Sequence, residues 1–309
     1  MSAAPEISVL VCTRNRARAL ARCLGAVSRQ QTSFSLETVV VDNGSSDETR
    51  ACVEEAARRD PGIRYLHEPE PGLSRARNRG VLAASAPILV SLDDDAEPIA
   101  GWLESFYGAC RETDAAAIGG PILARFEAPP PPWLAGQLRV LSAQDYGCER
   151  RTIDSPPYLF GGNLAIRRHD LDAVGGFDEA FGRKGGALLQ GEDIDLCERL
   201  LGAGKRLAYE PGAVIYHWIS AERFDTRYWR RRAFDTGRTL ALHLEKRLPR
   251  GALALEILKK AAKLPLHGAM WAAASVAAER ETMVARERSI FVTLGLLRHV
   301  LRSRTVRHS

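Results

Sequence analysis

The chain has 309 residues, of which 45% are hydrophobic and 26% charged, a composition that excludes a fibrous or wholly disordered protein. Its six cysteines contain no Cys-x-x-Cys pair, which argues against a disulfide framework or a structural zinc site and favours a reducing compartment. The net charge of +5 is uneven, because residues 221–309 hold 19 Lys and Arg against 8 Asp and Glu, a net of +11, whereas residues 1–220 carry −6.

Three short β-branched runs, each followed by polar residues and then by a helical pattern, predict repeated strand–loop–helix units. The runs are 7–11, 36–41 and 87–92, and helical patterns cover 20–27 and 49–59. Such repeats form an α/β fold with a largely parallel sheet and helices on both faces. Ligands of these folds bind beyond the carboxyl ends of the strands, so we expect the chemistry in the residues that follow them.

Those residues are strongly polar. In chain order they are Thr13-Arg14-Asn15, Asp42 to Asp47, and Asp93-Asp94-Asp95. Residues 71–80 read as a turn into an arginine-rich helix start, which favours phosphate. Carboxylates near such a helix start indicate a divalent cation, Mg²⁺ or Mn²⁺, held between the protein and a diphosphate.

The middle of the chain has little periodicity. Residues 122–157 include a proline run at 129–132, which predicts a long extended loop over the site, with an inert spacer as the alternative. The glycine-rich segment 182–191 suits a mobile loop. These two segments are the expected determinants of the acceptor.

A helix is predicted over 192–201, and it begins with two carboxylates, Glu192 and Asp193. They point in different directions, so we expect only one to face the site as a base; the alternative for both is helix capping or an interaction with the helix dipole. His217 follows a short strand-like run. A single histidine at such a position is more often structural.

Beyond residue 220 the pattern becomes helical and basic. Residues 227–248 read as one helix, and 289–302 places four apolar side chains on one helix face. These are Ile290, Leu294, Leu297 and Leu301. The pattern predicts a basic amphipathic appendage over 221–309 that either packs on the body or lies on an anionic bilayer.

No signal peptide is visible in residues 1–12, and the most apolar run, 264–278, is shorter than the ~20 residues of a membrane span. We therefore expect a cytoplasmic protein that is peripheral on the inner face of the membrane if the appendage binds lipid.

Six motifs in this order resemble the family 2 glycosyltransferases over about residues 6–218. The motifs are Val9 to Arg16, Val41 to Thr49, Gly72 to Gly80, Leu92 to Asp95, Phe160 to Asn163, and Gly191 to Asp193. The resemblance implies a GT-A catalytic domain over 1–220, followed by the helical appendage. It also implies an inverting, metal-dependent enzyme of cell-surface glycan or polysaccharide biosynthesis. Such an enzyme transfers a sugar from a nucleoside-diphosphate sugar, with a UDP-sugar expected, to a hydroxyl of a saccharide or lipid-linked saccharide.

The resemblance also implies roles for individual residues. Those expected at the donor nucleotide are Thr13, Asn15, Asp42, Arg75, Asn78 and Asp93. Asp95 would hold the metal, although three consecutive aspartates leave a second frame open in which Asp94 takes part. His217 falls where many members contact the metal or diphosphate. Asp193 matches the general base, with Glu192 as the next candidate.

Three other interpretations compete with this one. A dinucleotide dehydrogenase would need G-x-G-x-x-G after the first strand, and Thr13 to Arg16 does not match it. A GT-A-fold nucleotidyltransferase would share the metal and nucleotide sites, but its glycine-rich, arginine-containing loop is absent. A non-catalytic membrane- or nucleic-acid-binding protein would use the basic tail and would not need Asp193. No nucleic-acid partner is expected.

Overall fold

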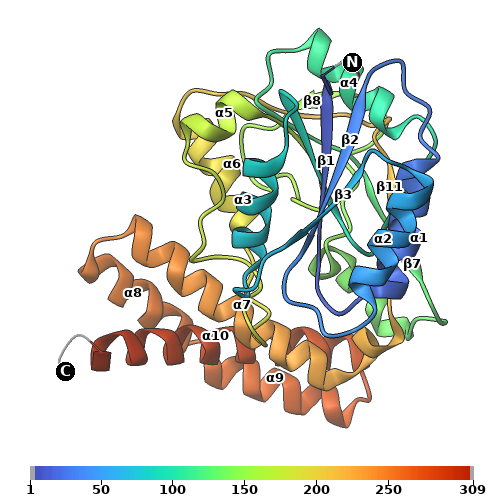
Figure 1. Cartoon of the computed structure of the whole chain (residues 1–309). Coiled ribbons are helices and arrows are strands. Elements are labelled where there is room, and N and C mark those ends of the chain that lie inside the picture. Colours follow the sequence, from blue (N-terminus) through green and yellow to red (C-terminus); the bar gives the residue numbers. More distant parts are fainter. Residues whose placement is uncertain (1–3, 307–309) are drawn as a thin grey trace. The chain divides into compact units, whose positions relative to one another are not determined.

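The structure is a computed structural model that describes residues 4–306 (Figure 1). These residues form two compact units. Unit 1 comprises the residues up to 125 together with 139–179 and 192–219. Unit 2 comprises 126–138, 180–191 and the residues from 220 onward. Unit 2 therefore contains two inner segments, 126–138 and 180–191, in addition to the C-terminal helices. The periodicity of the sequence does not indicate that these segments belong with the helices.

Unit 1 is built on a mostly parallel sheet, as predicted. Among the described residues the strand order is β3-β2-β1-β4-β9-β6-β10-β8. The strands are β1 Ile7–Thr13, β2 Leu36–Asp42, β3 Ile63–His67, β4 Ile88–Asp93, β6 Ala117–Gly119, β8 Arg151–Thr152, β9 Asn163–Arg167 and β10 Leu207–Tyr209. The first four strands in this order run parallel, and β9 pairs antiparallel with both β4 and β6. All three strands predicted from β-branched runs are confirmed.

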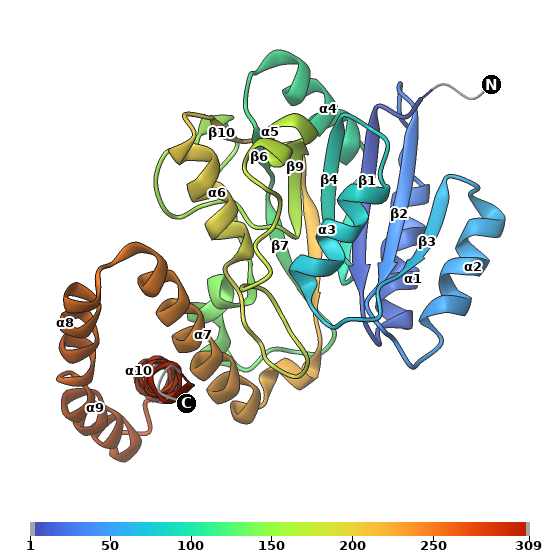
Figure 2. The same cartoon turned by 60° about the vertical axis from the view of Figure 1, so that its left-hand side comes forward.

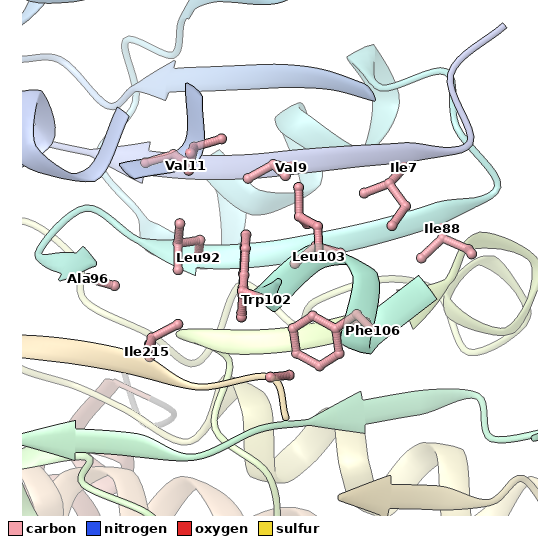
Figure 3. Packing of buried hydrophobic residues seen from close by; sticks show 14 of the residues in the cluster. Ile7, Val9, Val11, Ile88, Leu92, Ala96, Trp102, Leu103, Phe106 and Ile215 are labelled. Carbon is pink, nitrogen blue, oxygen red and sulfur yellow. The ribbon is translucent and has the colours of Figure 1, made fainter. Parts of the chain in front are cut away.

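Helices cover both faces of the sheet, because alternate side chains of each buried strand supply two separate cores. In β1, Val9 and Val11 belong to one core and Leu10 to the other. The first core takes α1 Ala17–Ser28, α2 Thr49–Arg59 and α4 Trp102–Glu112, and the second takes α3 Leu73–Ala83, α5 Arg168–Ala173 and α6 Glu192–Gly202. Figure 2 shows α3 on the face opposite α1. In Figure 3, Trp102 and Phe106 of α4 lie in the first core with β1 and β4.

A second, three-stranded sheet has the order β5-β11-β7, with β5 Ala96–Pro98, β7 Ile122–Phe126 and β11 Ile215–Ile219. The prediction of a long extended loop over 122–157 is therefore wrong at its start. A 3₁₀ helix, η1 Pro132–Leu141, also begins at the last residue of the proline run. The reason is that β7 has one buried residue, Ile122, followed by four half-buried ones. The period-2 alternation that marks a strand is absent from it.

Unit 2 contains η2 Ala221–Phe224 and four helices among its described residues: α7 Thr226–Arg247, α8 Arg250–Ala261, α9 Leu264–Val276 and α10 Arg280–Val306. The helix predicted over 227–248 is α7. Helices α7 and α10 touch backbone to backbone, because a Cβ atom at Gly237 would overlap the carbonyl of Val292 and one at Gly295 would overlap the carbonyl of Phe234. No helix within residues 4–306 is long and apolar enough to cross a membrane.

The apolar stripe predicted for α10 matches the face that packs only in part, since Leu297 packs on the core shared with α7. Leu294 and Leu301 are 40% and 64% exposed, whereas Leu296 and Val300 are buried with Ala241 of α7. The close approach at Gly295 turns the residues beside it toward α7, and sequence periodicity does not register this contact.

Candidate active site

The carboxyl ends of three neighbouring parallel strands bring the predicted polar residues together. In the strand register, Thr13 of β1 lies beside Asp42 of β2, and Cys12 lies beside Asp93 of β4. The expectation that these loops converge at one sheet edge is confirmed in unit 1.

Arg16 holds the two inner carboxylates of the aspartate cluster. Its Nη1 atom lies 2.9 Å from Oδ1 of Asp94 and 2.8 Å from Oδ2 of Asp95. Thr13 donates from Oγ1 to the other oxygen of Asp94 at 2.8 Å. Burial raises the pKa of Asp94, Arg16 opposes this shift, and the charge of Asp95 adds to it. Both oxygens of Asp94 are therefore engaged by the protein itself.

Asp95 differs from Asp94 in that one of its oxygens faces a histidine, His217. Oδ1 of Asp95 lies 3.3 Å from Nε2 of His217, and both side chains are buried. A carboxylate oxygen and an imidazole nitrogen directed at each other suit Mn²⁺ or Mg²⁺ when phosphate oxygens and water supply the remaining ligands. Within residues 4–306 no group of three His, Cys, Asp or Glu side chains is arranged to hold a metal ion.

Two of the predicted nucleotide-binding residues shape the loop after β2. Asp42 accepts from the backbone N–H of Ser45 at 2.8 Å and from the Tyr65 hydroxyl at 2.9 Å. Asn15 has a left-handed backbone conformation, with φ 52°, and its Oδ1 accepts from the N–H of Ser46 at 2.7 Å. Both residues lie at the predicted edge, where their hydrogen bonds fix the loop beside the strand ends.

Arg75 and Asn78, also predicted to contact the nucleotide or its phosphates, bind other parts of unit 1. Arg75 forms ion pairs with Glu70 at 2.7 Å and Glu179 at 2.8 Å. Asn78 holds the backbone of Phe177 at both ends, accepting from its N–H at 2.9 Å and donating to its carbonyl at 2.8 Å. In this structure Asn78 anchors the segment after α5.

Arg77 connects the aspartate cluster with the start of α6, and sequence reasoning did not single it out. It is buried, and its guanidinium lies 2.6 Å from Glu192 and 3.4 Å from Asp93. Gly161 and Gly162 make room for this contact. A Cβ on Gly161 would lie 3.1 Å from the Arg77 guanidinium, and one on Gly162 would lie 2.7 Å from Cγ of Asp93.

The two carboxylates at the start of α6 are in different environments. Glu192 is buried and bound to Arg77, whereas Asp193 is half-buried. Oδ2 of Asp193 accepts from the N–H of Gly161 at 3.1 Å, and Oδ1 accepts from the N–H of Ile194 at 2.8 Å. Burial, followed by the neighbouring charge of Glu192, raises the pKa of Asp193 to about 6. Asp193 is thus the accessible carboxylate, with a basicity suited to proton transfer near neutral pH.

Arg16 and Arg77 are the main site residues that the sequence analysis missed. Both stand within motifs that it quoted, but their partners lie 78 and 115 residues away, at Asp94 and Glu192. Arginines that a fold buries are almost always paired with a carboxylate. The presence of Arg16 and Arg77 inside the quoted motifs was therefore the available indication that each has a partner in the site.

Comparison with known proteins agrees with this geometry. The family model described as "Glycosyl transferase family 2" matches residues 8–175, more than half of the chain. The pre-mycofactocin glycosyltransferase of Mycobacterium tuberculosis is 31% identical over 231 residues, which cover 71% of this chain but only 46% of that protein. The glucosyl-dolichyl phosphate glucuronosyltransferase of Haloferax volcanii is 26% identical over 223 residues, 69% of each chain.

Among solved structures, the mannosyltransferase PcManGT from Pyrobaculum calidifontis, in complex with GDP-Man and Mn²⁺, has a TM-score of 0.64 at 20% identity. The likeness covers 96% of this chain and 88% of that one, and it shows the GT-A fold. Since the matched segment also carries the strand ends that converge in unit 1, the chain belongs to glycosyl transferase family 2.

Proposed function

We propose that this protein transfers a sugar from a nucleoside-diphosphate sugar to an acceptor hydroxyl with inversion at the anomeric carbon. The observation that carries the proposal is Asp193, a half-buried carboxylate held by two backbone N–H groups in the same unit as the aspartate cluster. A UDP-sugar is the first donor to test. A GDP-sugar is the second, because the structural neighbour PcManGT was solved with GDP-Man.

In the proposed reaction Asp193 accepts the proton of the acceptor hydroxyl while that oxygen attacks the anomeric carbon. The bond from this carbon to the diphosphate oxygen breaks on the opposite side, and the diphosphate leaves with the bonding electrons. Gly161 and Ile194 keep the carboxylate of Asp193 in place through their N–H groups. Arg77 fixes Glu192 and Asp93 around it.

A divalent cation on Asp95 and His217 would neutralise negative charge that develops on the leaving diphosphate. Arg16 keeps Asp94 and Asp95 in a fixed arrangement through its ion pairs with both. The proposed donor-binding residues Thr13, Asn15, Asp42 and Asp93 lie at or directly after the carboxyl ends of β1, β2 and β4.

Ligand stabilisation tests the proposal directly. The matching nucleoside-diphosphate sugar, with Mn²⁺ at a hundredfold excess over its Kd, is expected to stabilise the protein by about 2.7 kcal/mol. A thermal-shift panel of UDP-, GDP- and dTDP-sugars, with Mn²⁺ and with EDTA, measures this effect. The Asp95→Asn variant should lose most of the Mn²⁺-dependent stabilisation. The control variant Asp114→Asn should keep it, because Asp114 is exposed and lies outside the aspartate cluster. The proposal fails if no nucleotide sugar stabilises the wild-type protein in the presence of Mn²⁺ or Mg²⁺.

We further propose that unit 2 holds the enzyme on an anionic membrane, where a lipid-linked acceptor would be concentrated. Helix α9 contains no charged residue, yet Ala274 is its one buried side chain. Leu258 at the end of α8 and Leu266 in α9 are 64% and 59% exposed. Lys259 and Lys263 lie between these leucines in the sequence and are also exposed. Apolar side chains next to lysines suit an anionic lipid surface better than water. The Haloferax volcanii relative, whose name specifies a dolichyl phosphate, makes a lipid-linked acceptor reasonable.

Co-sedimentation with vesicles tests this surface. Binding to anionic vesicles is expected at low salt and should weaken as salt rises, since each lysine near the surface contributes about 1 kcal/mol. Leu258→Gln combined with Leu266→Gln should lower the bound fraction by roughly tenfold or more, because burying one leucine contributes about 1.5–3 kcal/mol. Leu82→Gln is the matched control, being 80% exposed on α3 of unit 1. Equal binding by the double variant and the control would rule out α8 and α9 as the attachment surface.

A further inference from the structure

Unit 2 contains a group of arginines at the side of α7 that faces the segment 180–191. Arg232 is only 4% exposed, and its Nη2 donates to Oε1 of Gln190 at 3.0 Å. Its Nε is also buried but has no hydrogen-bond partner. Arg183 comes from the facing segment. Within the part of the chain that the structure describes, neither Arg232 nor Arg183 has an ion-pair partner.

The hydroxyl of Tyr228 stands one helical turn before Arg232 on the same side of α7. It is buried and has no hydrogen-bond partner of normal geometry among the described residues. Burial alone would raise the pKa of this phenol, yet the charges of Arg232, Arg223 and Arg183 lower it below its ordinary value. The phenol therefore lies near the positive charges of these arginines.

Positive charges act on Arg232 as well. Burial, with a contribution from the charges of Arg183 and Arg223, lowers the pKa of Arg232 to about 10. The nearby carboxylate on α7, Asp235, does not compensate this charge. Its two oxygens accept from Arg238 at 2.9 Å and from the N–H of Leu188 at 2.8 Å. A buried guanidinium without a counter-charge is destabilising, and a bound anion would relieve the penalty.

We propose that Arg232, Arg183 and the Tyr228 hydroxyl form a binding site for a phosphate or diphosphate group. A guanidinium fork binds two oxygens of one phosphate, and the phenol supplies a further donor. A phosphate group carries close to two negative charges at neutral pH, which matches two arginines better than the single charge of a carboxylate. The segment 188–191 is already fixed beside these donors, because Gln190 donates from its backbone N–H to Thr239 and from its side chain to Thr236.

This phosphate chemistry has two sources in a glycosyltransferase: the diphosphate of a nucleotide donor, and a phosphate on another ligand such as a lipid phosphate. The inference is independent of sugar transfer, since a protein without transferase activity would still bind the anion. Inorganic diphosphate is therefore a suitable probe, used in metal-free buffer so that binding through a cation does not contribute.

Isothermal titration of the full chain with inorganic diphosphate in EDTA tests the site. Arg232→Gln should weaken binding by roughly tenfold or more, the loss expected when a charge-assisted hydrogen bond is removed. Arg227→Gln removes the same charge from an exposed position on α7 and should bind like the wild type. Tyr228→Phe keeps every charge and should produce a smaller loss. Competition then identifies the source: displacement of diphosphate by UDP or GDP assigns the site to the donor, and persistent binding under saturating nucleotide assigns it to a phosphate on another ligand.

Thermal melting separates anion binding from a purely structural role. In anion-free buffer Arg232→Met should melt at or above the wild-type temperature, because it removes a buried charge without a counter-charge. Diphosphate should then raise the melting temperature of the wild type but not that of the variant. The proposal is overturned if the wild type binds no diphosphate, if Arg232→Gln binds as tightly as Arg227→Gln, or if Arg232→Met melts lower by the same amount with and without diphosphate.

Discussion

Asp193→Asn is expected to slow sugar transfer by roughly 10²–10⁴-fold, the usual contribution of a general base, while donor binding stays unchanged. The amide keeps the shape of the side chain and its oxygen can still accept from the N–H of Gly161, but it cannot take the proton of the acceptor. Single-turnover rates with saturating donor measure the chemical step, and thermal shift with donor and Mn²⁺ measures binding.

The pH dependence provides a second signature of the same residue. Burial and the charge of Glu192 raise the pKa of Asp193 to about 6, and only its ionised form acts as a base. The rate should therefore rise with pH through about 6 and then level off, and the Asp193→Asn variant should lack this limb. Glu198→Gln, which removes a charge from the same helix, is the control and should keep both the rate and the limb. Near-normal turnover by Asp193→Asn would instead move the role to Glu192.

Arg77→Met is expected to lower the free energy of unfolding by about 3–5 kcal/mol. The arginine is the ion-pair partner of buried Glu192, at 2.6 Å, and removing it leaves that carboxylate in a low-dielectric environment without a counter-charge. Urea denaturation at neutral pH, followed by circular dichroism, gives the free-energy difference from the wild type.

A double variant identifies the cause of that loss. Glu192→Gln introduced together with Arg77→Met should recover a large part of the stability, because a neutral amide needs no counter-charge. Arg79→Met, a change on the same helix at an exposed position, should shift stability by no more than about 0.5 kcal/mol. A loss below about 1 kcal/mol for Arg77→Met, or no recovery in the double variant, would contradict a central role of the Arg77–Glu192 pair in the stability of unit 1.

The strands that carry the site could be predicted because each is a short buried run followed at once by polar residues. Strand β4 reads as Ile88 to Leu92 and then the three aspartates, and its parallel neighbours have the same form. Which partner each aspartate takes could not be read in this way. That distinction depends on Arg16 and His217, which approach the cluster from the start of α1 and from β11 through folding alone.

Other features were hidden because they depend on close approach between distant segments. Gly161 and Gly162 stand in the motif Phe160 to Asn163, but the motif alone does not indicate that they leave space for Arg77 and Asp93. The packed face of α10 depends on the backbone contact at Gly295. Periodicity alone selected Leu297, which packs, together with Leu294 and Leu301, which are exposed. Sequence patterns report which side chains are apolar, but not which backbone atoms a partner helix will touch.

The interleaving of the two units limits how this enzyme can be recombined with its relatives. The chain passes from one unit into the other after residues 125, 138, 179, 191 and 219. Within unit 2, Trp133 packs edge-on against Trp229 at 5.5 Å, and Phe181 stacks on His243 at 4.3 Å. A chimera joined at residue 220 would replace Trp229 and His243 while keeping the two inner segments that pack against them. A functional exchange of the helical unit must therefore move all three of its segments together, and the second of these grafts would end directly before the carboxylates that begin α6.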